Sequence, residues 1–250
     1  MSTGRTIGWS VLAVVLLVPA WFLGYHFTNF IGDPVEVVGA LPAFLTSGDT
    51  WVNVGISVAR VFGGLLAGVV LGTAMAFAIN RQGLLKETLT PYVTLALRTP
   101  SAIAAIVSLS IFHGSEIGYV AVVAYVTFPY VTTGLLDGLR SADRELDQMA
   151  QIYHLSTWAH MRHVLGPFIA PYMFAALRNA HALAWKIIVV VEIFGAATEG
   201  FGIQFSYAWE YFRILEVHLW LLLFMAVVLF AEYCVLRPAE RRVFRWRDAR

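Results

Sequence analysis

The sequence predicts an all-α membrane protein with about six transmembrane helices, and its composition and hydropathy pattern carry this prediction. Hydrophobic residues make up 59% of the 250 residues, whereas charged residues make up only 13%. A soluble domain has roughly 25% charged residues. Mean hydropathy is +0.71. The apolar residues also gather in repeated runs of roughly 20 residues or more, which is the length that a helix needs to cross a bilayer.

The expected spans form a single transmembrane domain over residues 1–250. They run approximately over residues 7–27, 52–79, 91–112, 117–139, 167–196 and 217–236. The first span is long for a signal peptide and no small-x-small cleavage site follows it, so we expect a retained helix, distorted near Pro19. The polar stretch after it, with DPVEVV and ALPAFL, is expected to form a short amphipathic piece at the membrane interface.

The distribution of basic residues predicts which side of the membrane each loop lies on, because cytoplasmic loops are rich in Lys and Arg. Basic residues follow the second, fourth and sixth spans: Arg81, Lys86, Arg140, Arg144, Arg162 and the tail 237–250 with its six arginines. The opposite loops carry Asp33, Glu36, Asp49, Glu116, Glu199, Glu210 and Glu216 against Arg213. We therefore expect a multi-pass protein of the cell inner (plasma) membrane with both termini in the cytoplasm.

Two bulk properties exclude some kinds of partner and site. The formal net charge of +1 favours no nucleic-acid partner. The single cysteine, Cys234, excludes an internal disulfide and a cysteine-rich metal site.

A polar segment, residues 143–167, separates the fourth and fifth spans and is closed by Gly166-Pro167. Its apolar residues recur mostly at three- and four-residue steps: Leu146, Met149, Ile152, Tyr153, Leu155, Trp158, Met161 and Val164. This pattern predicts an amphipathic helix that is broken at Ser156-Thr157, where a hydroxyl group could cap a second short helix. Taken alone, the pattern suits either a solvated helix on the membrane surface or a docking surface.

The three histidines of this segment do not have the spacing of metal ligands. His160 and His163 share a face, whereas His154 lies nearly two turns earlier. HExxH does not occur, and no carboxylate lies one turn from the histidine pair. We therefore expect no metal site.

The 143–167 segment resembles the cytoplasmic motif of bacterial ABC importer permeases. That motif reads Glu-Ala-Ala, three residues, Gly, nine residues, Ile-x-Leu-Pro. Gln148-Met149-Ala150 stands at Glu-Ala-Ala, His154 at the Gly, Val164 at the Ile and Gly166-Pro167 at Leu-Pro. The spacing is intact, although Gln, Met, His and Gly replace Glu, Ala, Gly and Leu.

The flanking sequence is similar to one subfamily of these permeases, which serves nitrate, taurine, alkanesulfonates, bicarbonate and related small solutes. The similar positions are Ser57-Val-Ala-Arg60 with the glycines after it, Arg98, Phe112-His-Gly114, Leu135 to Arg140, Trp185, Glu192, Gly195, Ala196 and Glu199-Gly-Phe-Gly202. The resemblance covers roughly residues 35 to 245 and implies the type I ABC importer permease fold with a cytoplasmic coupling helix.

The resemblance also implies partners and a set of coupling residues. The chain would form a homodimer in the lipid membrane, bind two copies of an ABC ATPase subunit and receive its solute from an extracytoplasmic substrate-binding protein. The residues implied to contact the ATPase are Gln148, Met149, Ala150, His154, Leu155, Trp158, Met161, Arg162, Gly166 and Pro167. Neither Lys86 nor Lys186 lies in a GxxxxGK[ST] loop, so ATP and Mg²⁺ are expected on the partner, and the chain is expected to have no cofactor and no enzymatic activity.

Charged and polar residues within the spans are candidates for the translocation path: Arg98, His113, Lys186 and Glu192. Lys186 and Glu192 are six residues apart, roughly 240° around a helix, and are poor partners for each other. Glu192 also suits a structural role near the outer gate. Arg60 and Arg178 are expected to lie near helix ends and to extend to the interface.

Two other functions remain open at this stage. The chain could be a stand-alone secondary transporter or channel that uses Lys186 and Glu192 in an ion relay, although no inverted repeat is evident. It could also be a membrane enzyme that uses its histidines, although these lack ligand spacing. Gly64, Gly68 and Gly72, spaced four apart, are expected to let two helices pack closely.

Overall fold

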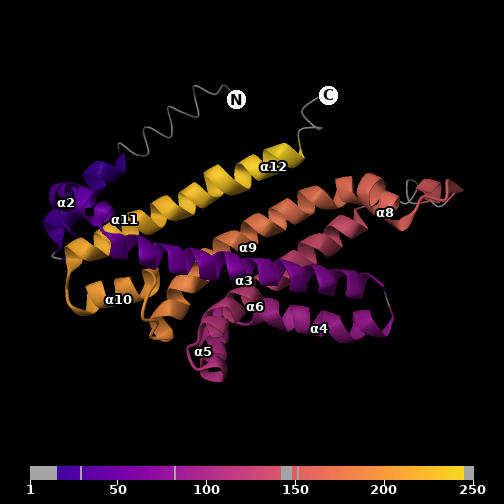
Figure 1. Ribbon diagram of the computed structural model, residues 1–250, viewed down its shortest axis with the longest axis horizontal. Helices are drawn as coiled ribbons and strands as arrows, with labels where there is room; N and C mark the ends of the chain where they lie inside the picture. The colour runs from indigo at the N-terminus through magenta and orange to yellow at the C-terminus, as the bar shows by residue number, and fades with distance from the viewer. Residues whose placement is uncertain (1–15, 29, 82, 142–147, 151, 245–250) are drawn as a thin grey trace.

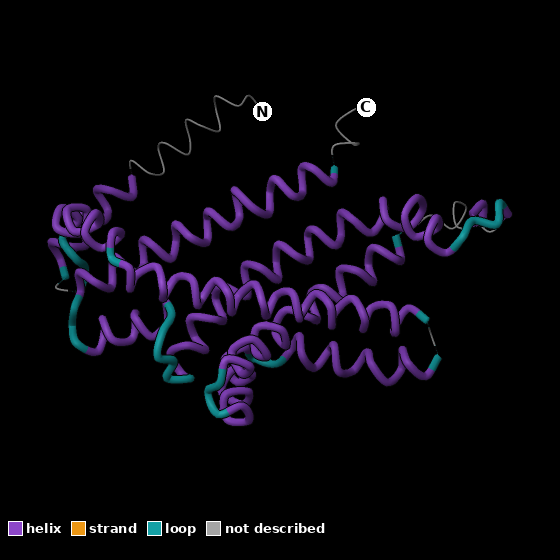
Figure 2. The backbone as a smooth tube through the Cα atoms, in the orientation of Figure 1, coloured by secondary structure: helices purple, strands orange, loops and turns teal. Residues whose placement is uncertain are grey.

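The computed structural model describes residues 16–28, 30–81, 83–141, 148–150 and 152–244. Every regular element in these ranges is a helix, which confirms the predicted fold class (Figures 1 and 2). After the helix Leu16–Phe27 come α2 (Pro34–Thr46), α3 (Gly48–Asn80), α4 (Leu84–Arg98), α5 (Ser101–Phe112), α6 (Glu116–Arg140), α8 (Thr157–His160), η1 (Met161–Leu165), α9 (Gly166–Phe194), α10 (Phe201–Glu210), α11 (Ile214–Phe230), η2 (Ala231–Leu236) and α12 (Arg237–Val243).

Four continuous helices in the described part of the chain are long and apolar enough to cross a membrane. They are Gly48–Asn80, Glu116–Arg140, Thr157–Phe194 and Ile214–Val243, and a bent pair of shorter helices brings the number to five. The expected first span, 7–27, lies partly outside the described residues, and its second half is the helix Leu16–Phe27.

The expected third span, 91–112, is wrong as a single helix. The structure has α4 and α5 there, bent by 106° at a short break. Thr99, the residue before Pro100, is extended with ψ 122°, because a proline ring disfavours the α region for the preceding residue. The Thr99 N–H closes α4 on the carbonyl of Leu95 at 2.9 Å, and α5 begins after Pro100.

Gly166-Pro167 does not close the 143–167 segment as expected, because α8, η1 and α9 form one helix over Thr157–Phe194. Proline lacks an N–H and clashes with the carbonyl one turn earlier. The π-helical turn η1 accommodates it: the Gly166 N–H donates to the carbonyl of Met161, five residues back. The same arrangement precedes Pro238, where the Arg237 N–H donates to the carbonyl of Glu232, so the sixth span continues to Val243.

The glycines of α3 let it pack closely against α6, as the sequence predicts. A Cβ at Gly64 would lie 2.4 Å from the Cβ of Val123, and a Cβ at Gly68 would lie 2.1 Å from the hydroxyl of Thr127. The Thr132 hydroxyl donates across the contact to the carbonyl of Gly72 at 3.1 Å. Small residues at this spacing allow helix backbones to approach closely in lipid.

The two ends of the helical bundle differ in charge. The α3–α4 turn, the C-terminus of α6, and α8 lie at one end, whereas α2 and α10 lie at the other (Figure 1). The end with α8 carries Arg81, Lys86, Arg140 and Arg162. The opposite end carries Asp33, Glu36, Asp49, Glu199, Glu210 and Glu216 together with Arg213.

Candidate functional site

A charge cluster, made of Ser57, Arg60, Glu116 and Glu192, joins three helices near the acidic end of the bundle. The side chain of Glu192, on α9, is fully buried. Its Oε1 accepts from the Ser57 hydroxyl at 2.7 Å and from Nη1 of Arg60 at 2.8 Å. Its Oε2 accepts from the backbone N–H of Gly202 at 2.8 Å. A buried carboxylate is tolerated only when such partners surround it.

Arg60 completes the cluster from α3, with only 4% of its side chain exposed. Its Nε donates to Oε2 of Glu116 at 2.8 Å, and its Nη2 donates to the other oxygen of that carboxylate. Its Nη1 also donates to the backbone carbonyl of Glu199 at 2.7 Å. The guanidinium lies 4.3 Å from the centre of the Tyr119 ring. The expectation that Arg60 extends to the interface is therefore wrong, because two carboxylates hold it inside the bundle.

The same part of α3 holds the N-terminus of α10. The backbone N–H of Gly200 donates to Oδ1 of Asn53 at 2.8 Å, and that of Phe201 donates to the Ser57 hydroxyl at 2.9 Å. These bonds satisfy N–H groups that a helix start leaves without intrahelical partners. Gly200 has φ 131°, and a Cβ there would lie 2.5 Å from the carboxylate of Glu192. The loop before α10 is thus fitted onto the buried carboxylate.

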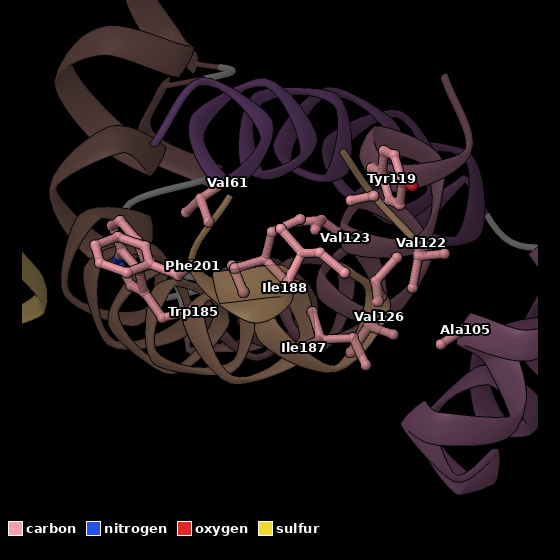
Figure 3. Close-up of a cluster of buried hydrophobic side chains, with 14 of the residues drawn as sticks. Val61, Ala105, Tyr119, Val122, Val123, Val126, Trp185, Ile187, Ile188 and Phe201 are labelled. Carbon is pink, nitrogen blue, oxygen red and sulfur yellow. The ribbon is translucent and has the colours of Figure 1, made fainter. Parts of the chain in front are cut away.

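A hydrophobic core lies beside the charge cluster and fixes its helices. Figure 3 shows Tyr119, Val61, Ile188, Trp185 and Phe201 gathered between these helices. Each has at most 2% of its surface exposed. With its oxygens occupied by three donors, Glu192 is placed as a structural anchor of α3, α9 and α10 and not as a mobile proton carrier.

The other residues expected on the path do not join this cluster. Arg98 ends α4 at the bend and is exposed. His113 is exposed and takes a left-handed conformation, φ 51°, where α5 ends. Lys186 is exposed on α9, and within the described part of the chain it forms no ion pair. Arg178 is half exposed and forms ion pairs with Glu232, at 3.3 Å, and with Glu240, which join α9 to η2 and α12.

The 143–167 segment is described at 148–150 and 152–167. His154 has φ 50°, in the left-handed region that favours glycine. The Leu155 N–H donates to the carbonyl of Ala150 at 3.0 Å across this turn. The motif of the resembled permeases has glycine at this position, and His is among the residues that adopt a positive φ more often than most. The backbone thus explains both the motif's glycine and its replacement.

The second half of the segment forms the short helix α8, as predicted from Ser156. The Ser156 hydroxyl accepts from the N–H of Ala159 at 3.3 Å, which confirms the expected cap. The guanidinium of Arg162 lies 4.9 Å from the centre of the Trp158 ring. Trp158 nevertheless keeps 65% of its surface exposed.

Within the described residues, much of the apolar side of the 143–167 segment is left exposed. Its exposed apolar residues are Met149, Ile152, Tyr153, Leu155 and Trp158. Ala150 is buried, and Gln148 is exposed. The segment lies at the end of the bundle away from the charge cluster (Figure 1). An exposed apolar patch of this kind on a helical segment is typical of an interaction surface.

Residues 68–240, more than half of the chain, match the family described as the binding-protein-dependent transport system inner membrane component. The chain belongs to this family. It is 22% identical over 251 residues to a protein named as an aliphatic sulfonates transport permease, SsuC, of Bacillus subtilis (strain 168), covering 98% of this chain and 90% of that protein. It is 26% identical over 220 residues to the nitrate import permease protein NrtB of Leptolyngbya laminosa, covering 83% and 77%.

A solved structure supports the fold. The crystal structure of an amino acid ABC transporter with histidines matches with a TM-score of 0.65 at 18% sequence identity, covering 84% of this chain and 99% of that chain. The expected ABC transporter permease fold and the resemblance to the nitrate and sulfonate type are thereby confirmed. The chain is a multi-pass protein of the inner membrane.

The pairing of Arg60 with Glu192 and Glu116 was missed from the sequence. Arg60 and Glu192 are 132 positions apart, and no local spacing in the sequence links them. A usable signal was present for Arg60, since a charge within a span must be paired or hydrated and Arg60 lies more than two turns from either end of α3.

Proposed function

We propose that this chain is the transmembrane permease subunit of an ATP-driven importer for a small polar or anionic solute. The observation that carries the proposal is the exposed apolar side of the 143–167 segment, with a left-handed turn at His154 where the family motif has glycine. A helical segment with an apolar side fits a groove on a partner protein. We propose that this partner is an ABC ATPase subunit that carries the ATP and Mg²⁺.

The assembly we propose contains two copies of this chain, two copies of the ATPase and one extracytoplasmic binding protein. The basic end of the bundle, which includes α8, lies in the cytoplasm, since cytoplasmic loops are rich in Lys and Arg. Both termini then lie in the cytoplasm, and the acidic end with α2 and α10 faces the binding protein. A reporter fused after Arg250 should have the activity of a cytoplasmic fusion.

Solute movement would follow from rigid-body motion of the two copies. ATP binding closes the ATPase dimer and brings the two 143–167 segments together. The helix Thr157–Phe194 begins in that segment and ends at the charge cluster, so it carries the displacement from one end of the bundle to the other. Arg98 and His113 are proposed to line the path beside this helix.

The solute itself is not specified by family membership. Relatives are named for aliphatic sulfonates, nitrate and riboflavin. Two of these named solutes, the aliphatic sulfonates and nitrate, are small anions. The alternative of a stand-alone transporter with a Lys186–Glu192 relay has less support, because Glu192 is buried under three donors whereas Lys186 is exposed on another face.

The test is ATP hydrolysis by the complex reconstituted in lipid, with and without the loaded binding protein. Deletion of residues 148–163 should abolish the stimulation by the binding protein, whereas the unmodified complex should show it. Substrate-dependent uptake by the purified chain alone, without ATP, would overturn the proposed function.

A further inference from the structure

One face of α9 is exposed along much of its length. The exposed residues on it, here called the α9 stripe, are Tyr172, Ala175, Asn179, Ala182, Lys186 and Ile193. Steps of three, four and seven place these side chains within about 80° of each other around a helix. Residues on the other faces, among them Ala180, Ile187 and Ile188, are buried against the bundle.

The composition of the α9 stripe does not suit contact with lipid. Three of its central residues are Ala175, Asn179 and Ala182, and the fourth is a lysine. The exposed residues of α11 provide an internal comparison, because apart from Ala226 they are the large apolar residues Leu221, Met225, Leu229 and Phe230. Within one chain, therefore, α11 has a surface of the lipid-facing kind, whereas α9 has one of small and polar residues.

Lys186 lies too deep in the helix to extend easily to the interface. It is eight residues from Phe194, about 12 Å along the axis. The helix α10 folds back against that end of α9, with the Gly202 N–H bonded to Glu192, so the end is itself covered by protein. No carboxylate in the described ranges forms an ion pair with Lys186. A lysine at such a depth is stable only if water or a counter-ion reaches it.

Two-fold symmetry adds a second constraint, which rests on the proposed homodimer. A two-fold axis brings the same surface of both copies together. A dry contact between two α9 stripes would place two lysines in one apolar interface with no compensating charge. A water-filled path between the copies removes this conflict, because it hydrates both ammonium groups and concentrates anions near them.

We propose that the α9 stripe lines the aqueous translocation path and that Lys186 gives this path its preference for anions. The solute class that follows is a small molecule with an exposed anionic group, such as a sulfonate, a carboxylate or an inorganic oxyanion. This inference rests on the permease function and adds a specific charge filter to it.

The test uses thiol chemistry and needs no knowledge of the solute. Cys234 is the only cysteine, so Cys234→Ser gives a background without thiols. Ala182→Cys then places one thiol on the α9 stripe, one turn from Lys186, and Met225→Cys places a matched thiol on the lipid-type face of α11. Each variant is reconstituted with the ATPase in liposomes and treated with sulfonatoethyl or trimethylammonioethyl methanethiosulfonate, which are anionic and cationic.

We expect Ala182→Cys to react with both reagents and Met225→Cys to react with neither. Adding Lys186→Met to Ala182→Cys should lower the ratio of anionic to cationic reaction rates by about fivefold, because one nearby unit charge changes the local concentration of each reagent. Equal inertness of the two thiols, or an unchanged ratio, would overturn the inference. ATP hydrolysis stimulated by the binding protein, measured on the same liposomes, separates this outcome from failure of the permease function.

Discussion

Replacing Glu192 with Gln should strongly destabilise the bundle, because the substitution leaves buried donors without acceptors. Glutamine offers one carbonyl oxygen and an NH₂ group, whereas the site presents donors to both oxygens. If its oxygen faces Arg60 and Ser57, its NH₂ group faces the N–H of Gly202. The reverse orientation sets the NH₂ group against the guanidinium.

The expected magnitude follows from burial. The side chain of Glu192 is 0% exposed and that of Arg60 is 4% exposed, and removing one partner of a buried ion pair costs about 3–5 kcal/mol. Glu116→Gln is the matched control, since it makes the same carboxylate-to-amide change in the other carboxylate that pairs with Arg60. The side chain of Glu116 is 67% exposed, and an exposed pair contributes about 0–1 kcal/mol.

The assay is unfolding of the reconstituted chain, followed by tryptophan fluorescence against temperature and SDS concentration. Glu192→Gln should unfold well before the unmodified chain, and Glu116→Gln should remain close to it. The double variant Arg60→Gln, Glu192→Gln should lose less stability than the sum of the losses in the single variants Arg60→Gln and Glu192→Gln. The double variant removes both charges and leaves neither unpaired. Equal stability of Glu192→Gln and Glu116→Gln would refute the argument from burial.

Three further predictions concern single residues. Trp158→Ala should weaken docking of the ATPase by about 2 kcal/mol, roughly 30-fold, and lower stimulated ATP hydrolysis and transport together; full stimulation would contradict the docking role. His154→Gly should keep this stimulation and His154→Val should reduce it, since a β-branched residue is strained at φ 50°; equal activities would count against the turn. Gly200→Ala should lower the unfolding temperature, unlike Gly39→Ala, whose added Cβ meets nothing within 4 Å.

The sequence predicted those features of the fold that depend on local pattern. Apolar runs located the spans, the glycine spacing located the α3–α6 contact, and Ser156 located the start of α8. The bend at Pro100 was missed because the apolar character of the sequence continues through it. Its signal was nevertheless local, since a residue before proline is disfavoured in the α region.

The charge cluster could not be predicted in the same way. Its bonds join residues of α3, α6 and α9 that are 56 to 135 positions apart, and single-sequence periodicity contains no information on which helices are neighbours. The hydropathy of a span says only that Arg60 and Glu192 need partners, not which ones they have. The left-handed turn at His154 was hidden for a different reason: a histidine carries no positive-φ signal comparable to glycine.

The helix Thr157–Phe194 explains why the two ends of the chain can act together. Its first residues include the exposed Trp158, and its last turns include the fully buried Glu192. The hydrogen bonds that join Glu192 to α3 and α10 make the C-terminal end of this helix move with the bundle. The N-terminal end, with Trp158, is exposed and can bind a partner. Within this helix, η1 is a π-helical turn, where Pro167 interrupts the regular hydrogen bonding. Under the proposed function, a displacement of Trp158 by the ATPase therefore moves α9 as a whole, including its end at Glu192. The bend would be confined to the turn before Pro167.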